Sequence, residues 1–403
     1  MSEWKKVKLD DCLELITYGF TNPMPDTLSG PWKVTAKDIN NGRIVFETAR
    51  HTSQDAFDLD LTDKSRPKKG DILLTKDGTL GRLAIVSDER ICINQSVALL
   101  RVKKDILSVS YLYYLLSTPL YQAKMLADAG GAAIKHIYIT RVNQLMIPFP
   151  PYDEQCRIAT ILSRYDSLIE NYQKQIKLLE EAAQRLYKEW FVDLHFPGHE
   201  NTKIVDGVPE GWEKRKIEEL VNIKSGYAFK SKDWQSKGHP VVKIKDINGT
   251  FVLSDSLDCV PITVAKKANQ FILRTGDLVI AMTGATIGKV GIVTEDNIYT
   301  NQRVGKFFVK DRFILPFLYC YFKQKSTIDL VLKISSSSAA QPNISGSQLG
   351  SFVFMYNKEL LDKYCDKVQY LFQKIILLQK QIRLLTEARD RLLPKLMSGE
   401  LKV

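Results

Sequence analysis

The sequence predicts a mixed α/β protein built as a tandem duplication, in which a globular α/β domain and a long helix each occur twice. Three observations support this: motifs recur at a near-constant offset, short strand-like runs fill the first part of each copy, and regular apolar spacing fills the second. We expect the two helices to form an antiparallel coiled coil, because one such helix cannot bury its apolar stripe alone. The predicted parts are globular domain 1, helical spacer 1, a linker, globular domain 2 and helical spacer 2, at 1–150, 151–192, 193–211, 212–357 and 358–403.

The duplication is visible in segments that recur 206 to 208 residues later. Chance agreement at such a constant offset is negligible, so the two halves are copies of one unit. The recurring pairs are Trp4–Leu9 with Trp212–Ile217, Val34–Asn40 with Val242–Asn248, Gly70–Ile72 with Gly276–Leu278, Ile85–Val86 with Ile292–Val293, and Asn94-Gln95 with Asn301-Gln302.

The globular parts contain short apolar and β-branched runs between Gly, Pro, Asn and Asp. Ile72–Thr75 and Leu278–Ala281 are predicted strands of this kind. Helical patches such as Tyr111–Leu116 interrupt them, which indicates a mixed α/β domain.

The helical parts show apolar residues whose spacing alternates between four and three, as in the seam of a coiled coil. A helix of about 38 residues would extend roughly 57 Å. Arg389 alone breaks the apolar pattern, and Pro394 should end or kink the second helix near Leu393. The first seam is Ile158, Leu162, Tyr165, Ile169, Tyr172, Ile176, Leu179, Ala183, Leu186 and Trp190. The second seam is Tyr364, Val368, Leu371, Ile375, Leu378, Ile382, Leu385, Arg389, Leu392 and Leu396.

The chain carries 57 Lys and Arg against 46 Asp and Glu, a formal net charge of +11. Such an excess favours a polyanionic partner, because each neutralised phosphate releases counterions; the alternative is that the charge serves only solubility. The excess is largest over 212–357, at +8, whereas 151–211 carries −4. The second globular domain is therefore the stronger electrostatic candidate for phosphate contact.

The cysteines are scattered without a C-x-x-C pair, which indicates reduced thiols. Residues 1–10 are charged and lack the apolar core of a signal peptide. The longest apolar stretch, Phe313–Phe322, contains Pro316 and is too short to span a bilayer. We therefore expect a cytoplasmic protein with no membrane partner.

Local motifs add a resemblance to a known family. They are Gly-Asp before an apolar run at 70–74 and 276–280, Ile147–Pro151 leading through Glu154-Gln155 into the first helix, Ala340–Ser345, and Leu392–Gly399. With the layout of domain, helix, domain, helix, the whole chain resembles the specificity subunit of a type I restriction–modification system. One departure is visible. The Pro-Pro pair before the first helix is replaced by Phe354–Asn357 before the second helix, so the angle at which the chain enters the second helix is open.

The resemblance implies a function. Each globular domain would be a target-recognition domain that reads one half of a bipartite, asymmetric site in double-stranded DNA. The helices would set the spacing and dock two methyltransferase (modification) subunits, which methylate adenine on its exocyclic amine using S-adenosylmethionine. Restriction would need further motor–nuclease subunits with ATP and Mg²⁺. This chain itself would be non-catalytic and would bind no metal and none of these cofactors.

Sequences that superficially suggest catalysis each lack an essential part. Phe149–Tyr152 resembles the Asp/Asn-Pro-Pro-Tyr loop of adenine methyltransferases, but Phe149 has no oxygen to accept from the target amine, which favours a turn into the helix. The segment 284–290 is one residue shorter than a P-loop and lacks its Ser or Thr, leaving a glycine turn beside a cation or a plain hairpin turn.

Two other catalytic or metal centres are also unsupported. Pro25-Asp26 is not followed by the acidic-x-Lys pair of a nuclease. His195 and His199 flank Pro197 and Gly198 without cysteine ligands, which favours a surface linker over a zinc site.

The DNA-binding candidates are side chains with paired donors and acceptors, suited to bases, and cations or hydroxyls, suited to phosphates. In the first domain they are Thr17, Tyr18, Lys37, Lys76, Thr79, Arg82, Asn94, Gln95, Lys135 and His136. In the second domain they are Tyr227, Lys230, Lys232, Lys245, Thr283, Lys289, Asn301, Gln302, Arg303, Gln341 and Asn343.

Two qualifications apply to these candidates. The loop Ser335–Ser338 could approach a phosphate or could only be flexible. Residues common to both copies, such as Lys37 with Lys245 and Asn94-Gln95 with Asn301-Gln302, are better candidates for DNA-backbone contact or for the fold, because domains that read different half-sites must differ where sequence is set.

Two alternative functions remain open from the sequence. The chain could be the recognition subunit of a related system whose methyltransferase and nuclease share one chain, which the neighbouring genes would reveal. It could also be a coiled-coil adaptor whose globular domains bind proteins, which a DNA-binding measurement would decide.

Overall fold

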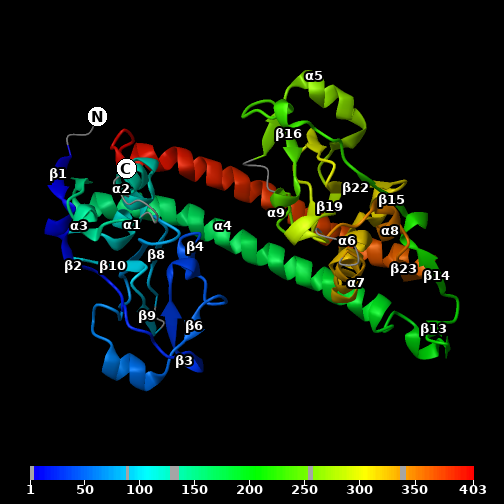
Figure 1. Ribbon diagram of the computed structural model, residues 1–403, viewed down its shortest axis with the longest axis horizontal. Helices are drawn as coiled ribbons and strands as arrows, with labels where there is room; N and C mark the ends of the chain where they lie inside the picture. Colours follow the sequence, from blue (N-terminus) through cyan, green and yellow to red (C-terminus); the bar gives the residue numbers. More distant parts are fainter. Residues whose placement is uncertain (1–3, 88–89, 128–135, 253–256, 336–341) are drawn as a thin grey trace. The chain divides into compact units, whose positions relative to one another are not determined.

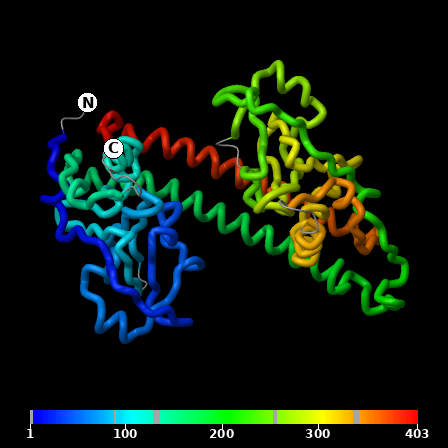
Figure 2. The backbone as a smooth tube through the Cα atoms, viewed as in Figure 1, coloured from blue at the N-terminus to red at the C-terminus, as the bar shows by residue number. Residues whose placement is uncertain are grey.

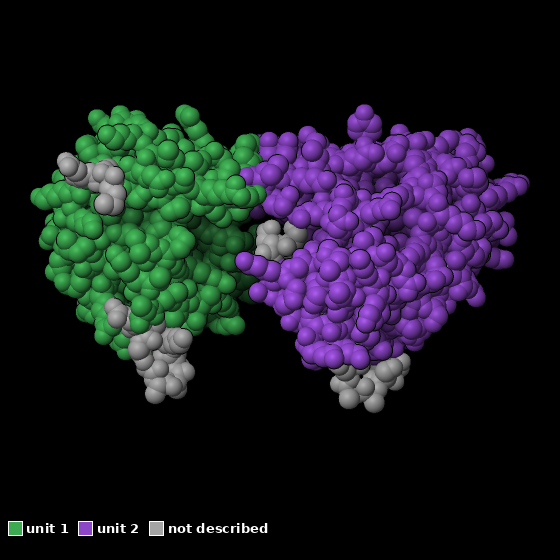
Figure 3. Space-filling model, turned by 90° about the horizontal axis from the view of Figure 1, so that it is seen from above, with its two compact units in different colours: residues 1–168, 385–403 green, residues 169–384 purple. Residues whose placement is uncertain are grey.

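The computed structural model describes residues 4–87, 90–127, 136–252, 257–335 and 342–403. The chain divides into two compact units, coloured separately in Figure 3. Unit 1 comprises 1–168 and 385–403, and unit 2 comprises 169–384. Each unit contains one globular domain and part of each long helix.

Unit 1 is built on a four-stranded antiparallel sheet with strand order β2-β10-β7-β8. These strands are Leu13–Tyr18, Val97–Val102, Ile72–Thr75 and Leu83–Ile85. All four side chains of β7 are buried. An unbroken apolar run is expected of a strand that is covered on both faces, and the predicted strand is confirmed.

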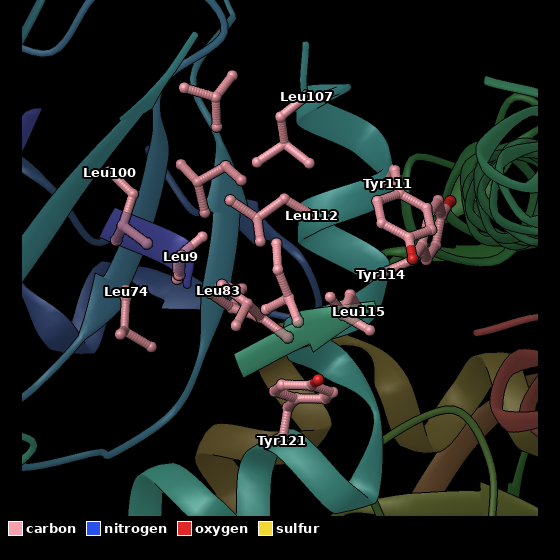
Figure 4. Packing of buried hydrophobic residues seen from close by; sticks show 14 of the residues in the cluster. Leu9, Leu74, Leu83, Leu100, Leu107, Tyr111, Leu112, Tyr114, Leu115 and Tyr121 are labelled. Carbon is pink, nitrogen blue, oxygen red and sulfur yellow. The ribbon is translucent and has the colours of Figure 1, made fainter. Parts of the chain in front are cut away.

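Both faces of this sheet are buried against other elements. Leu74 and Leu100 share one core with α1 (Val109–Ser117) and α2 (Pro119–Ala127), and Figure 4 shows these leucines across from Leu112 of α1. Leu73 and Leu99 belong to the opposite core, which the sheet β6-β3-β9 covers. This alternation is the period of two that a strand imposes. The predicted helical patch at 111–116 is confirmed as part of α1.

The other elements of unit 1 outside the long helices are β1 (Lys5–Lys8), η1 (Leu9–Cys12), β3 (Thr27–Val34), η2 (Ala36–Asp38), β4 (Ile39–Asn40), β5 (Arg43–Ile44), β6 (Arg50–His51), η3 (Ala56–Asp60), β9 (Ile91–Ile93), α3 (Ile139–Val142) and β11 (Met146–Phe149).

Unit 2 repeats the same sheet, in the order β15-β22-β19-β20. These strands are Val221–Ser225, Val304–Val309, Leu278–Ala281 and Val290–Ile292, which confirms the strand predicted at 278–281. Helix α6 (Leu315–Lys323) is buried along all but its last residue. The longest apolar stretch of the sequence is thus largely a core helix.

The other elements of unit 2 outside the long helices are η5 (His199–Asn201), β12 (Ile204–Val205), β13 (Val208–Pro209), β14 (Glu213–Lys216), η6 (Ile217–Glu219), η7 (Ser231–Asp233), β16 (His239–Val242), η8 (Ile244–Asp246), β17 (Asp258–Val260), α5 (Ile262–Ala265), η9 (Lys266–Phe271), β18 (Ile272–Leu273), η10 (Gly284–Thr286), β21 (Ile298–Thr300), η11 (Arg312–Ile314), α7 (Lys325–Ser335), α8 (Gly346–Gly350) and β23 (Val353–Tyr356).

The two long helices are α4 (Tyr152–Tyr187), continued by the π-helix η4 (Lys188–Val192), and α9 (Lys358–Met397). Pro150 and Pro151 lead directly into α4, as predicted for the turn at 149–152. At the second entrance Asn357 replaces the prolines and caps α9, because its Oδ1 accepts from the N–H of Leu360 at 3.1 Å.

In unit 1 the start of α4 and the end of α9 run antiparallel. Arg157 Nε donates to the Val403 carbonyl at 3.1 Å, and nine residues further along α4 Asp166 accepts from Arg389 at 2.6 Å. Ile158 and Leu162 pack in one core with Leu393 and Leu396. Figures 1 and 2 show these two helix segments, green and red, beside the globular domain of unit 1.

Of the two outcomes predicted from Pro394, an end or a kink of the second helix near Leu393, the end is wrong. Helix α9 continues through Pro394 to Met397. A proline removes the hydrogen bond of its own N–H and its ring crowds the carbonyl four residues earlier, but here Pro394 lies in the last turn, so little helix follows it. The helix then closes normally: Ser398 N donates to the Pro394 carbonyl at 3.0 Å, and Gly399 adopts a φ of 70°.

In unit 2 the end of α4 meets the start of α9. The Tyr364 hydroxyl donates to the Ala183 carbonyl at 3.1 Å, and its ring lies 5.9 Å from Tyr187 and 5.4 Å from Phe191. Every seam position predicted from the sequence is buried or half-buried. The spacing missed further buried positions on these helices, such as Tyr187, Leu361, Cys365, Phe372 and Met397.

Among the described residues, no helix combines the length and the apolar character needed to cross a bilayer.

Candidate nucleic-acid interface

One end of the main sheet in unit 1 collects most of the predicted candidates. The register places Tyr18 opposite Ala98, Val97 opposite Thr75 and Leu74 opposite Leu83. The end of β2, the start of β10, the end of β7 and the start of β8 therefore meet at one edge, here called sheet end 1. The candidates at or next to these strand ends are Thr17, Tyr18, Lys76, Thr79, Arg82, Asn94 and Gln95.

A tight turn holds sheet end 1 together. An added Cβ on Gly19 would lie 1.8 Å from the Ile93 carbonyl oxygen, so this close approach requires glycine. Asn94 Oδ1 accepts from the N–H of Ser96 at 3.2 Å and from its hydroxyl at 2.6 Å. The Asn94 side chain is thus used by the fold, whereas Gln95 is exposed.

Asp77 is the centre of a charged cluster at sheet end 1. Its Oδ1 lies 2.6 Å from His136 Nδ1, and its Oδ2 accepts from Lys76 Nζ at 2.8 Å. Burial acts to raise the pKa of Asp77, but the hydrogen bonds from Lys76 and His136 bring it below its ordinary value. Lys76 Nζ also lies 5.3 Å from the centroid of the Tyr18 ring. The cluster joins a strand-end carboxylate to three predicted candidates.

The individual candidates of the first domain have different environments. Arg82 Nη1 donates to the Ile39 carbonyl at 3.1 Å, so its guanidinium ties the β7–β8 turn to the segment after η2. Lys37 is exposed on η2, and Thr79 is half-buried in the β7–β8 turn. Thr17 and Tyr18 line a hollow of about 600 Å³ beside Lys64. Lys135 lies outside the described residues.

Unit 2 repeats this arrangement at an edge here called sheet end 2. Ser225 lies opposite Gly305, and Ala281 opposite Val304. An added Cβ on Gly226 would lie 2.3 Å from the Thr300 carbonyl oxygen. Asn301 Oδ1 accepts from the N–H of Arg303 at 3.2 Å, the bond that Asn94 makes in unit 1.

Three other candidates converge on sheet end 2. Thr283 forms a backbone bridge with Asn343, and Tyr227 forms one with Asn301. Thr283 Oγ1 is buried without a hydrogen-bond partner in the described structure. Gln302, Arg303 and Asn343 are exposed. Gln341 lies outside the described residues.

The lysine candidates of unit 2 are all exposed: Lys230, Lys232, Lys245 and Lys289. Lys289 follows Gly288 in the hairpin between β19 and β20, the place that Arg82 occupies in unit 1. Lys245 Nζ lies 3.1 Å from Asp258 Oδ2. Hydrogen bonds from Lys243 and then Lys245 lower the pKa of Asp258, so Lys245 is partly neutralised within the protein.

The structure corrects one expectation and adds residues that the sequence analysis missed. Ser335 is not in a loop: it ends α7, is buried, and its hydroxyl donates to the Leu332 carbonyl at 3.0 Å. Ser336–Ser338 lie outside the described residues. Asp77 and Ser96 were missed. A signal was available for both, since they occupy the repeat positions of the candidates Thr283 and Arg303.

Both sheet ends therefore present amides, hydroxyls and cations on a rigid edge. Such groups can pair with base edges and with phosphates. The two edges share one backbone frame but carry different side chains.

Comparison with known proteins identifies the class. The family model of the type I restriction modification DNA specificity domain matches residues 1–181 and 209–356. The chain belongs to this family and carries the domain twice.

Individual relatives agree with this assignment. The type I restriction enzyme MjaIX specificity subunit of Methanocaldococcus jannaschii is 28% identical, over 93% of this chain and 87% of its own length. The MjaVIII specificity subunit of the same organism is 26% identical, over 100% and 93%. The crystal structure of a type I restriction–modification S subunit from M. genitalium shares the fold, with a TM-score of 0.60 at 22% identity, covering 98% of this chain and 96% of that one.

These findings confirm the predicted fold class, a duplicated α/β domain with long helices. They also confirm the prediction that the chain is the DNA-recognition subunit of a type I system and is not its catalytic subunit.

Proposed function

We propose that each globular domain reads one half of a bipartite, asymmetric site in double-stranded DNA. The observation that carries this proposal is the repeated sheet end. The same turn, held by Asn94 or Asn301, adjoins Asp77 in one domain and Thr283 in the other. A shared backbone arrangement with different side chains suits a protein that recognises two different short sequences.

A domain exchange tests this proposal. Replacing residues 17–140 with the matching segment of a relative should change one half-site and leave the other half-site and the spacing as they were. Mapping methylated adenines in cells that carry the assembled complex measures the outcome. A simultaneous change of both half-sites would contradict the two-reader proposal.

The long helices would dock two methyltransferase subunits, with motor–nuclease subunits completing the complex. An apolar stripe on α9 supports this: Tyr370, Leu377 and Leu384 recur every seven residues and are 78%, 47% and 56% exposed. The segment 367–386 around them contains no Asp or Glu. Exposed apolar side chains at heptad spacing suit a partner helix, and the surrounding lysines suit acidic flanks on it.

Introducing a negative charge into this stripe tests the docking role. Leu377→Glu should weaken co-purification with the methyltransferase subunit while leaving DNA binding by the isolated chain intact. Glu359→Gln, on the same helix but outside the stripe, is the control. Equal co-purification of both variants would contradict docking at this face.

The chain would act in the cytoplasm, where it meets DNA, and would itself hold neither S-adenosylmethionine, ATP nor Mg²⁺. These would bind the partner subunits. The purified chain should then neither methylate nor cut DNA, and should support sequence-specific methylation only after the methyltransferase is added. Turnover that stays with the chain through further purification would contradict this.

A further inference from the structure

Backbone hydrogen bonds establish which positions of the two sheet ends correspond. Ile137 N donates to the Lys76 carbonyl at 2.9 Å, and Ile344 N donates to the Met282 carbonyl at 3.0 Å. Asp77 therefore faces His136 as Thr283 faces Asn343, and both pairs form antiparallel bridges. The two pairs occupy one place in the fold.

At this place the side chains of the two domains carry different functional groups. The residues that the two domains share instead maintain the backbone conformation of the turns. Asn94 and Asn301 make the same turn. Gly81 and Gly288 have φ of 80° and 82°, which only glycine adopts readily. By contrast, the facing pair is a carboxylate with an imidazole in domain 1 and a hydroxyl with an amide in domain 2.

We propose that the facing pairs Asp77–His136 and Thr283–Asn343 are the specificity-determining residues of their domains, and that Asp77 and Asn343 contact base edges in the major groove. This inference rests on the proposed function of the two domains and names the side chains that set the sequence in each. Two domains that read different half-sites must differ in the side chains that contact bases. Such side chains are expected at equivalent backbone positions that carry different functional groups in the two domains.

The chemistry of domain 2 favours an A·T pair. The Asn343 side chain is exposed, and its amide has no hydrogen-bond partner within the described residues. An amide can pair with both N6 and N7 of adenine. The neighbouring Thr283 Oγ1 also lacks a partner there but is buried, so the exposed Asn343 amide is the group of this pair that can reach a base.

The chemistry of domain 1 favours a C·G pair. An ionised carboxylate is purely an acceptor and offers about four lone-pair directions. Among the described residues, Lys76 and His136 use two of them. The remaining capacity suits the N4 amine of cytosine. The His136 side chain is 40% exposed and orients the carboxylate from the facing strand.

Reciprocal exchange of the pairs tests the inference in the assembled methyltransferase complex. One variant combines Asp77→Thr with His136→Asn, and the other combines Thr283→Asp with Asn343→His. The first should shift one position of one half-site from C·G towards A·T, and the second should do the converse in the other half-site. The preference should change by about tenfold or more, as expected for a good base contact. Mapping methylated adenines across a genome gives both motifs.

A matched control makes the same chemical change at the other end of the sheet. Asp10 is an exposed carboxylate in η1, which immediately precedes β2. Asp77, by contrast, lies at sheet end 1, the opposite end of the sheet. Asp10→Thr should leave both half-sites unchanged.

Several outcomes would overturn the inference. If the exchange variants methylate the parental site with the parental preference, even at a uniformly lower rate, the pairs only support the fold. If a variant loses methylation, its binding is measured on DNA probes that carry each of the four base pairs at each half-site position. Equal weakening of binding on all probes also overturns the inference. A half-site that changes with the exchange of 17–140 but not with the pair exchange leaves the two-reader proposal intact and removes this inference alone.

Discussion

Arg389 of α9 donates from Nη1 to Asp166 Oδ1 of α4 at 2.6 Å, and Asp166 Oδ2 accepts from the Tyr114 hydroxyl of α1, also at 2.6 Å. Arg389 is the residue that interrupts the apolar seam. One carboxylate thus joins both long helices to the globular domain of unit 1. A guanidinium at this seam position is explained by a specific polar partner.

Replacing Arg389 with Leu should therefore destabilise unit 1, although it completes the apolar seam. The loss of a charged hydrogen bond to the half-buried Asp166 predicts a fall of about 1–3 kcal/mol in the free energy of unfolding. Urea denaturation measures it. The control, Arg391→Leu, removes a surface pair with Glu387 and should cost less than about 0.5 kcal/mol. Equal effects of the two substitutions would show that the Asp166 contact contributes nothing specific.

Asn94 should stabilise the turn and should not determine which DNA sequence is recognised. Asn94→Ala removes the oxygen that Ser96 donates to, so the free energy of unfolding should fall by about 1 kcal/mol. Asn94→Asp keeps that oxygen and should stay close to the parent protein. The methylated motif should be the same in both variants. A changed motif with unaltered stability would instead make Asn94 a base-reading residue.

Lys37 on η2 and Lys289 at sheet end 2 should contact phosphates, because both are exposed and neither has an ion-pair partner in the described part of the chain. Each substitution to Ala should weaken binding to all DNA sequences alike and reduce the slope of log affinity against log salt by about 1. Titrations at several salt concentrations measure the slope. Lys402→Ala, outside both sheet ends, should leave the slope unchanged. A sequence-dependent loss would assign these lysines to bases.

The long helices should act as a spacer whose length can be changed by whole heptads. Seven residues inserted after Ile176 and seven after Ile382 rotate each seam by only ~20° and lengthen each helix by roughly 10 Å. Since DNA rises about 3.4 Å per base pair, the gap between half-sites should grow by about three pairs. Mapping the methylated sites of the double-insertion variant measures the gap.

The insertion must enter both helices, because an insertion in one would bulge from the pair. The pairs Asp166–Arg389 and Ala183–Tyr364 lie outside the lengthened segments and serve as anchors. An active variant that keeps the original gap would contradict the spacer role and favour a scaffold whose linkers, such as 193–211, set the distance.

The sequence by itself determined the duplication, the strands at 72–75 and 278–281, and the inward seam of both helices. Each of these is a local or periodic property, since the period of a strand or helix follows from backbone geometry and appears directly in the order of residues. The correspondence of Asn94-Gln95 with Asn301-Gln302 was also visible, because repeated residues occupy equivalent places in the two copies.

Only the tertiary structure decided what each polar side chain does. Arg82 bonds to a carbonyl 43 residues away, Asp77 to a histidine 59 residues away, and Arg389 to a carboxylate 223 residues away. Likewise, Glu180 accepts from Tyr319 and Lys323, which no spacing in the sequence indicates. Such partners are chosen by strand register and helix packing, and the energy of a hydrogen bond depends on the distance and angle between atoms that the covalent chain does not bring together. For that reason the partners of Asp77 could not be predicted, although its repeat position was visible, while Asn94 and Arg82, selected as DNA contacts, already bond within the fold.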